Sequence, residues 1–387
     1  MSELLIVLIY ASSMLGGRVA YLAVGAFSIW GGLRLISDFS FFNNKFTPLQ
    51  LFVFVLPFFV FCTWCYGVLK GLAGGVTPAY AFSNFFGLSL YLLFYPFFFY
   101  VSVKSIKKVL LIASFFACVF AIYSVFSFFA RVGGGGEANV VGLSGFRTIY
   151  SVAFLYVTPF LLLSMVSIFL LGNGSSRITL MSFFLLALYS FVLIVPAMSK
   201  GYILVFLFLG FLIFSRGVII SFGFLLVRSS LLFLTGLAVF FVLVLLFFTD
   251  IYDVLIFSFS SNEPSNSVRS EQFSYLISEW NLQGAGLGSG LVSGYSRDDS
   301  GYGFELTYIN LINKLGVFSI PLFLSYIVPV FLGLKLFLID GDHVRGAWVL
   351  GLMAYLIPGA GNPLLLAPVF VFSHFAAIKI AISADRS

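Results

Sequence analysis

The sequence predicts an all-α polytopic membrane protein with about twelve transmembrane helices. Of its 387 residues, 61% are hydrophobic and only 9% are charged, whereas a soluble domain carries about 25% charged residues. The apolar runs are continuous rather than alternating, so they predict helices and not the strands of a β-barrel. This composition excludes soluble metabolic enzymes and nucleic-acid-binding proteins, and we expect residues 1–387 to form a single integral membrane domain.

Apolar runs bounded by glycine, proline or charged residues place the predicted spans. A bilayer crossing takes roughly 20 mostly apolar residues. The first two runs are separated only by Gly16, Gly17 and Arg18, and the eighth extends past Arg216, so twelve is a best count. In chain order the predicted spans are 3–16, 19–33, 49–69, 81–102, 109–130, 149–171, 178–196, 201–214, 230–249, 305–334, 346–358 and 364–382.

The charges in the loops predict the orientation. Loops on one side of this map hold twelve basic and five acidic residues, a net of +7, and those on the other hold eight basic and nine acidic residues, a net of −1. Because cytoplasmic loops are enriched in lysine and arginine, both termini are predicted to be cytoplasmic. The chain's net charge of +6 therefore does not require a nucleic-acid partner, and residues 250–304 are predicted to face outward.

The outward segment 250–304 is much longer than an ordinary connection, so it is predicted to be functional. Asn266 or Ser267 is expected to cap a short helix that runs to Trp280. The apolar residues of this helix recur at helical spacing, which predicts an amphipathic helix on the membrane surface. They are Phe273, Leu276, Ile277 and Trp280.

Arg269 lies four residues before Phe273 and therefore shares the apolar stripe of this helix. A cation directed toward the helix bundle needs an anion. One interpretation is that the guanidinium binds a phosphate at the membrane surface, where it can engage two oxygens at once. The other is that Arg269 snorkels or pairs with Glu271 or with an aspartate of the same loop.

The glycines at positions 284, 286, 288 and 290 follow this helix. They do not form a nucleotide-binding fingerprint, because Ser289 stands where the third glycine should be and no βαβ unit surrounds them. Glycine at alternate positions lets backbone approach backbone or ligand closely. Both a tight turn against a lipid-linked substrate and a plain flexible turn are compatible with the sequence.

Glu305 is predicted to lie in the first turn of the tenth span, at its outward end. There the helix dipole favours a carboxylate, and the same carboxylate is a candidate general base for a sugar hydroxyl. Thr307, Asn310 and Lys314 follow on one helical face. In a membrane protein such a polar face is expected to point into the bundle or a watery cavity.

Arg147 and Lys200 are two further cations at predicted outward helix ends, where free backbone N–H groups already attract anions. With Arg269 they make three candidate phosphate ligands. No cluster of histidine, cysteine or acidic residues has metal-ligand spacing, and no GxxxxGK[ST] motif is present. We therefore expect no metal, nucleotide or other cofactor, and the energy must come from the substrate.

The order of these features resembles the O-antigen polymerase and ligase superfamily, membrane glycosyltransferases that act on undecaprenyl-diphosphate-linked sugars. The resemblance covers about 120 residues and depends on Ser199-Lys200-Gly201, where the family commonly shows Ser-Arg-Gly, on Arg269, Trp280 and Gly284 to Gly288, and on Glu305, Tyr308 and Leu315-Gly316. Lys200 keeps the charge of the arginine but loses its bidentate geometry. The large loop lacks the histidine that the ligases typically carry, which favours a polymerase.

The resemblance implies a transferase at the periplasmic face of the bacterial inner membrane. The growing chain on undecaprenyl diphosphate would be the donor, and the terminal sugar of a new lipid-linked unit the acceptor. Glu305 and Arg269 are the expected catalytic residues, and Arg147, Lys200 and Arg269 the expected diphosphate ligands. The expected glycan ligands are Trp280, Tyr302, Tyr308 and Asn310. Membrane lipids are expected partners, and a chain-length regulator is a further candidate partner.

Two other functions fit the same composition. An O-antigen ligase would share the fold and transfer the glycan to lipid A-core instead. A lipid-linked oligosaccharide flippase would show charges along a central cavity and pseudo-symmetric halves, whereas this sequence has one dominant outward loop and no evident repeat. A structural membrane subunit would leave the position of Arg269 unexplained.

Overall fold

The computed structural model describes about half of the chain, and the described residues form helices and contain no strand. The described parts are 2–14, 18–37, 46–110, 112–113, 264–297, 301–361 and 367–383, together with residues 201, 204, 205, 208, 211, 212, 215, 260 and 365. The predicted spans at 149–171, 178–196 and 230–249 lie outside these residues, as do most of 109–130 and about half of 201–214.

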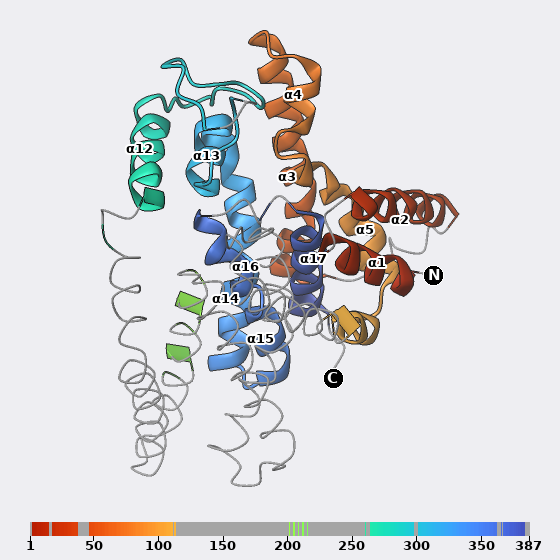
Figure 1. The fold of residues 1–387 in the computed structure, drawn as a ribbon. Helices are drawn as coiled ribbons and strands as arrows, with labels where there is room; N and C mark the ends of the chain where they lie inside the picture. The colour runs from red at the N-terminus through yellow and green to blue at the C-terminus, as the bar shows by residue number, and fades with distance from the viewer. Residues whose placement is uncertain are drawn as a thin grey trace, which may run out of the picture.

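The N-terminal helices and the C-terminal helices pack together in Figure 1. The N-terminal set comprises α1 (Ser2–Met14), α2 (Arg18–Ser37), α3 (Pro48–Ala73), α4 (Pro78–Ser83), the 3₁₀ helix η2 (Phe86–Leu93) and α5 (Phe94–Tyr100). The C-terminal set comprises α12 (Pro264–Ser278), α13 (Thr307–Leu315), η4 (Gly316–Ser319), α14 (Ile320–Leu338), α15 (His343–Leu350), α16 (Met353–Leu356), η5 (Pro358–Gly361) and α17 (Pro368–Ile382).

The described helices are those of a membrane protein. Four of them are long and apolar enough to cross a bilayer, and a bent pair supplies a fifth. The helix Phe86–Tyr100, within the predicted span 81–102, meets the next helix at 115°, so the chain bends sharply where this predicted span ends. The count of twelve stays a prediction. The candidate spans are Ala20–Ser37, Pro48–Ala73, Thr307–Leu338 and His343–Gly361, and the bent pair is Phe86–Tyr100 with Val103–Leu110.

Helix α3 separates two ends of the molecule. It begins with Pro48 after a capping box in which Thr47 and Gln50 satisfy each other's backbone N–H groups. The Gln50 amide also donates to the carbonyl of Ile382, at the end of α17. At 26 residues, α3 is about 39 Å long, and its other end contacts the loop after α12 at Gly71. The C-terminal end of α17 and this loop therefore lie at opposite ends of α3.

Many of the cations predicted to face the cytoplasm gather at the α17 end of α3. Arg345 donates to the carbonyls of Ile380 and Ala381, which lack partners because α17 ends there. Lys379 likewise donates to a carbonyl at the end of α5. Lys107 lies 5.9 Å from the ring centroid of Trp348, near Arg345. This grouping agrees with the charge pattern of the sequence.

The predicted tenth span, 305–334, is not one straight helix. The rings of Tyr308 on α13 and Phe323 on α14 lie 5.9 Å apart, whereas a continuous helix would place residues fifteen positions apart at about 22 Å. Gly316 supplies the bend with φ 57° and ψ −136°, a conformation that favours glycine. Helix α13 therefore lies alongside the start of α14.

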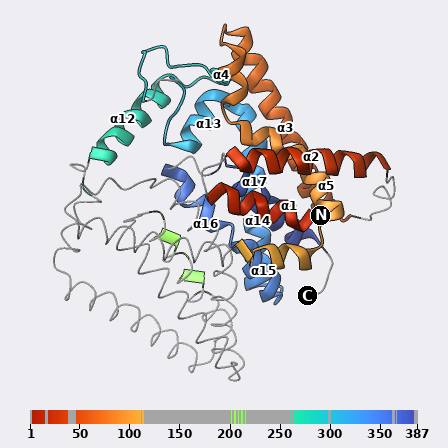
Figure 2. The ribbon, with the colours of Figure 1, turned by 45° about the vertical axis from the view of Figure 1, so that its right-hand side comes forward.

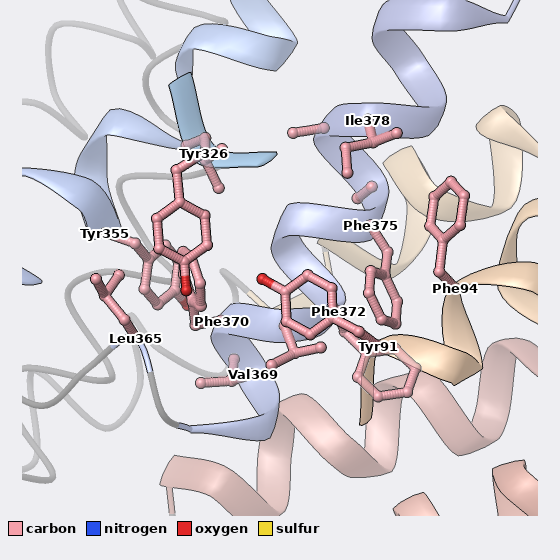
Figure 3. Packing of buried hydrophobic residues seen from close by; sticks show 14 of the residues in the cluster. Tyr91, Phe94, Tyr326, Tyr355, Leu365, Val369, Phe370, Phe372, Phe375 and Ile378 are labelled. Atoms are coloured by element: carbon pink, nitrogen blue, oxygen red, sulfur yellow. The ribbon is translucent and has the colours of Figure 1, made fainter. Parts of the chain in front are cut away.

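The core between α14, α17 and the N-terminal helices contains a buried histidine, His374 (Figure 3 shows the surrounding rings). Pro329 has no N–H, so the carbonyl of Ser325 lacks its helical partner. His374 Nε2 lies 2.7 Å from that carbonyl oxygen and must donate to it, so Nδ1 accepts from the Tyr91 hydroxyl, also at 2.7 Å. One imidazole thus joins η2, α14 and α17.

Replacing His374 with alanine is expected to destabilise the protein by about 3–5 kcal/mol, because it leaves a cavity and two buried polar atoms without partners. The midpoint of thermal unfolding in detergent measures this. His343, which is less buried and whose Nδ1 lies 3.0 Å from a backbone carbonyl, is the matched control. An unfolding midpoint for His374→Ala at or above that of His343→Ala would contradict the structural role.

Candidate functional site

Helices α12 and α13 pack side by side and run in the same direction (Figures 1 and 2). Gln272, in the middle of α12, accepts from the backbone N–H of Glu305 at 3.1 Å, just before α13 begins. Further along, the Asn313 amide on α13 donates to the carbonyl of Leu276 at 2.9 Å. The N-terminus of α13, which carries a partial positive charge, therefore lies beside the middle of α12.

Just before the N-terminus of α13, two arginines form ion pairs with one carboxylate. Arg269 donates from Nε to Glu305 Oε2 at 3.1 Å, and Arg297 Nη2 lies 2.7 Å from Glu305 Oε1. The side chains are 23%, 34% and 23% exposed for Arg269, Arg297 and Glu305, so water reaches all three. We call these three residues the Arg–Glu–Arg cluster. Its formal charge is +1, and it lies against η5, where Gly361 is next to Arg269.

The structure corrects the predicted setting of Glu305. Helix α13 begins at Thr307 with Leu306 as its N-cap residue, so Glu305 precedes the first turn instead of lying within it. Its carboxylate is therefore held by guanidinium groups and not by the helix N–H groups. Among the described residues, Arg269 forms a salt bridge with Glu305, whereas the aspartates of the same loop lie outside the described residues.

Helix α12 begins three or four residues before its predicted start and ends two residues before its predicted end, and its buried stripe differs from the predicted one. It begins at Pro264, a residue that is favoured at a first helical position. The buried side carries Gln272 and Leu276, both 0% exposed, and the half-buried Arg269. Phe273, Ile277 and Trp280, predicted to share that face, are exposed. Leu276 packs with Leu291 and Phe304 in a small core that joins α12 to the following loop.

The glycine-rich segment 284–288, which we call the glycine clasp, contacts protein backbone. Gly284, Gly286 and Gly288 have φ of +76°, +93° and +78°. A Cβ at these positions would lie 2.4 to 2.6 Å from the backbone of α13, α3 and α4 respectively. The N–H of Gly286 donates to the carbonyl of Lys314, and that of Leu287 donates to the carbonyl of Gly67. The clasp therefore joins three helices, and of the two interpretations of these glycines the flexible turn is excluded.

A carboxylate fixes the loop that follows the clasp. Glu279, just after α12, accepts from the backbone N–H groups of Val292 and Ser293 at 2.5 and 2.9 Å. Burial acts to raise the pKa of Glu279, but these hydrogen bonds and that of the Ser293 side chain outweigh it, so the pKa lies below its ordinary value. The carboxylate is therefore charged at neutral pH and holds the loop against α12.

The polar face of α13 points into the protein, as predicted. Thr307, Asn310 and Lys314 are 1%, 3% and 0% exposed. Lys314 Nζ has no hydrogen-bond partner and lies 5.6 Å from the ring centroid of Phe304, a cation–π arrangement. Its nearest compensating charge is Glu279. A buried cation of this kind is costly, and a helix with a purely structural role would not need one.

The predicted glycan ligands do not form one group. Trp280 lies eleven residues, or about 16 Å, along α12 from Arg269. The Tyr302 hydroxyl bonds to Ser83 at 2.7 Å, and its ring lies against Tyr80 on α4. Tyr308 donates to the carbonyl of Leu356 at 2.6 Å, and Asn310 is buried beneath Tyr302. Of the four, Tyr308 and Asn310 lie on α13, and the roles of all four stay predictions.

Arg147 and Lys200 lie outside the described residues, but Gly201, which follows Lys200, is described. A Cβ at Gly201 would lie 2.8 Å from Pro358 Cα at the start of η5, and one at Gly361, at the end of η5, would lie 3.7 Å from Arg269 Nε. Because η5 is a single 3₁₀ turn, Gly201 is within about 15 Å of Arg269. The chain segment predicted to supply Lys200 therefore approaches the Arg–Glu–Arg cluster.

Arg297 and Gln272 were not predicted from the sequence as site residues. Gln272 had a usable signal, because it lies three residues after Arg269 and so shares its helical face. Arg297 had none, since it precedes Asp298 and Asp299 in the chain and no periodicity relates it to Glu305.

Among the described residues, no group of three or more histidine, cysteine, aspartate or glutamate side chains is arranged to hold a metal ion. Scans of the chain against models of protein families, and searches of curated proteins and solved structures, found no match. The functional interpretation therefore rests on the residues and contacts described above.

Proposed function

We propose that this protein polymerises O-antigen repeat units at the periplasmic face of the bacterial inner membrane. The growing chain, linked to undecaprenyl diphosphate, is transferred to the terminal sugar of the incoming lipid-linked unit. A hydroxyl oxygen of the acceptor bonds to the anomeric carbon of the donor, and the bond from that carbon to the diphosphate breaks. The electron pair of the broken bond leaves with undecaprenyl diphosphate, so no nucleotide is consumed.

The observation that carries this proposal is the Arg–Glu–Arg cluster at the N-terminus of α13, beside α12. A leaving diphosphate gains negative charge in the transition state, and fixed guanidinium groups and helix N-termini stabilise it where water is partly excluded. Arg269 and Arg297 supply the charge. Glu305 lies between them and pairs with both guanidiniums, and it accepts the hydroxyl proton.

The buried polar side chains next to the cluster support a hydroxyl-rich substrate. Gln272, Asn310 and Asn313 each carry a buried amide atom without a hydrogen-bond partner. Gln272 and Asn313 lie where α12 and α13 contact each other. A site that handles only lipid would not keep such groups, because a buried polar atom without a partner is costly.

The banding of surface polysaccharide in a strain lacking this gene tests the proposal. Loss of a polymerase leaves lipid A-core bearing a single repeat unit, because ligation and export continue. Loss of a ligase or of a flippase leaves lipid A-core with no repeat unit at all. The single-unit pattern, reversed by the wild-type gene, is the expected result, and the bare pattern would replace the proposal with one of those two alternatives.

A further inference from the structure

The geometry of Glu305 is that of a bound anion. Each of its two oxygens lies against a different guanidinium: Arg269 Nε donates to Oε2, and Arg297 Nη2 forms an ion pair with Oε1. Arginine binds carboxylate and phosphate oxygens in the same manner, since both present planar or near-planar pairs of acceptors. The carboxylate thus occupies the position that an external oxyanion would take.

The two guanidiniums come from independent parts of the chain. Arg269 belongs to α12, and Arg297 belongs to the loop that is tied back to the end of α12 through Glu279. Both side chains are partly exposed, so an anion from solution or from the membrane surface reaches them without prior unfolding.

We propose that Glu305 is a built-in competitor at this site, and that a diphosphate displaces it from Arg269 and Arg297. Arg297 thereby becomes a diphosphate-binding residue in addition to those predicted from the sequence. This inference rests on the proposed function for the identity of the lipid-linked ligand, but the exchange itself concerns any diphosphate.

The exchange has a chemical consequence. A carboxylate held by two guanidiniums has both oxygens engaged, so neither oxygen is available to an acceptor hydroxyl. A diphosphate carries more negative charge than one carboxylate and therefore binds both arginines in place of Glu305. The oxygens of Glu305 are then available. The base is then freed only when the leaving group is bound, so the empty enzyme does not promote transfer to water.

Binding of inorganic diphosphate to the purified full-length protein in detergent, measured by calorimetry, tests the exchange. Glu305→Gln removes the competing charge and is expected to tighten binding about tenfold, the effect of losing partly exposed charge-assisted pairs. Arg297→Ala and Arg269→Ala are each expected to weaken binding about tenfold or more. Binding that is unchanged or weaker in Glu305→Gln would overturn the proposal, because a purely structural carboxylate predicts that result.

The matched control is Glu271→Gln. Glu271 lies on the exposed side of the same helix, so this variant changes the net charge by the same amount without touching either pair. It is expected to alter diphosphate binding by less than about twofold. A tenfold tightening in Glu271→Gln would reduce the effect at Glu305 to net charge and would also overturn the proposal.

A second arm separates this inference from the proposed function. The same variants are titrated with undecaprenyl diphosphate in nanodiscs. Tightening by Glu305→Gln for both ligands, or for the lipid alone, supports the exchange with a lipid-linked substrate. Tightening for inorganic diphosphate alone supports the exchange while counting against polymerisation. If wild-type protein lengthens chains but Glu305→Gln does not bind either diphosphate more tightly, the exchange is contradicted and the polymerase proposal is not.

Discussion

Replacing Gly286 with alanine is expected to remove nearly all folded protein from the membrane. At φ +93° a Cβ is strained, and the new methyl group would lie 2.5 Å from the backbone nitrogen of Gly71 on α3. Backbone cannot rotate away as a side chain does, so the clasp must leave α3. We expect a loss above about 4 kcal/mol, a large part of the stability of a typical domain. The amount of monodisperse protein after detergent extraction measures it.

Gly294→Ala separates the two causes of this effect. Gly294 has φ +75°, similar to that of Gly286, but a Cβ there would meet no atom within 4 Å. Its replacement therefore tests backbone strain alone, which costs about 1–2 kcal/mol. Folded protein from Gly294→Ala close to the wild-type amount, with almost none from Gly286→Ala, is the expected pair of results. Equal yields from both variants would mean that the clasp is not closed against α3.

Arg269→Ala and Glu305→Gln are each expected to stop chain lengthening while the protein stays folded and inserted. Removal of a general base costs about 10²–10⁴ in rate, and removal of a charge that stabilises the transition state costs about 10²–10³. The length distribution of surface polysaccharide in a complemented deletion strain gives the readout, with protein level measured in the same cells.

Arg269→Lys refines the first of these variants. Lysine keeps the charge but has no planar fork, so partial activity is expected, above Arg269→Ala and below wild type. Glu271→Gln, on the same helix, should lengthen chains normally. Full-length polysaccharide from Glu305→Gln at wild-type protein level would remove Glu305 from the proposed chemistry.

The membrane class and the polar segment were accessible from the sequence because they depend on composition. Continuous apolar runs can only be satisfied as helices in lipid, and the amphipathic spacing around Leu276 placed α12 to within four residues. The bend at Gly316 was not accessible. The apolar run continues through it, and the turn depends on Leu282 and Gly284 packing against Gly316 from elsewhere in the chain.

The candidate site was partly predictable for a similar reason. Because Arg269 lies on an apolar stripe, the sequence indicated that it has an anionic partner, and in the structure it pairs with Glu305. Glu305 was itself a candidate, because it was predicted to lie in the first turn of a helix. Arg297 is brought to Glu305 only by the fold of the loop, which local patterns do not encode. Trp280 and Tyr302 were grouped with Glu305 by proximity in sequence, but Trp280 lies beyond the C-terminal end of α12 and Tyr302 packs against α4.

Reconstitution with the purified protein tests the central claim most directly. Lipid vesicles containing the protein and undecaprenyl-diphosphate-linked repeat units are incubated with a chelator and without nucleotide, and both glycan length and released undecaprenyl diphosphate are measured. We expect a ladder of lipid-linked chains, with one undecaprenyl diphosphate released for each unit added, and no ladder with Arg269→Ala. If the protein is folded and binds the lipid-linked units but these remain single units, the result would contradict the account.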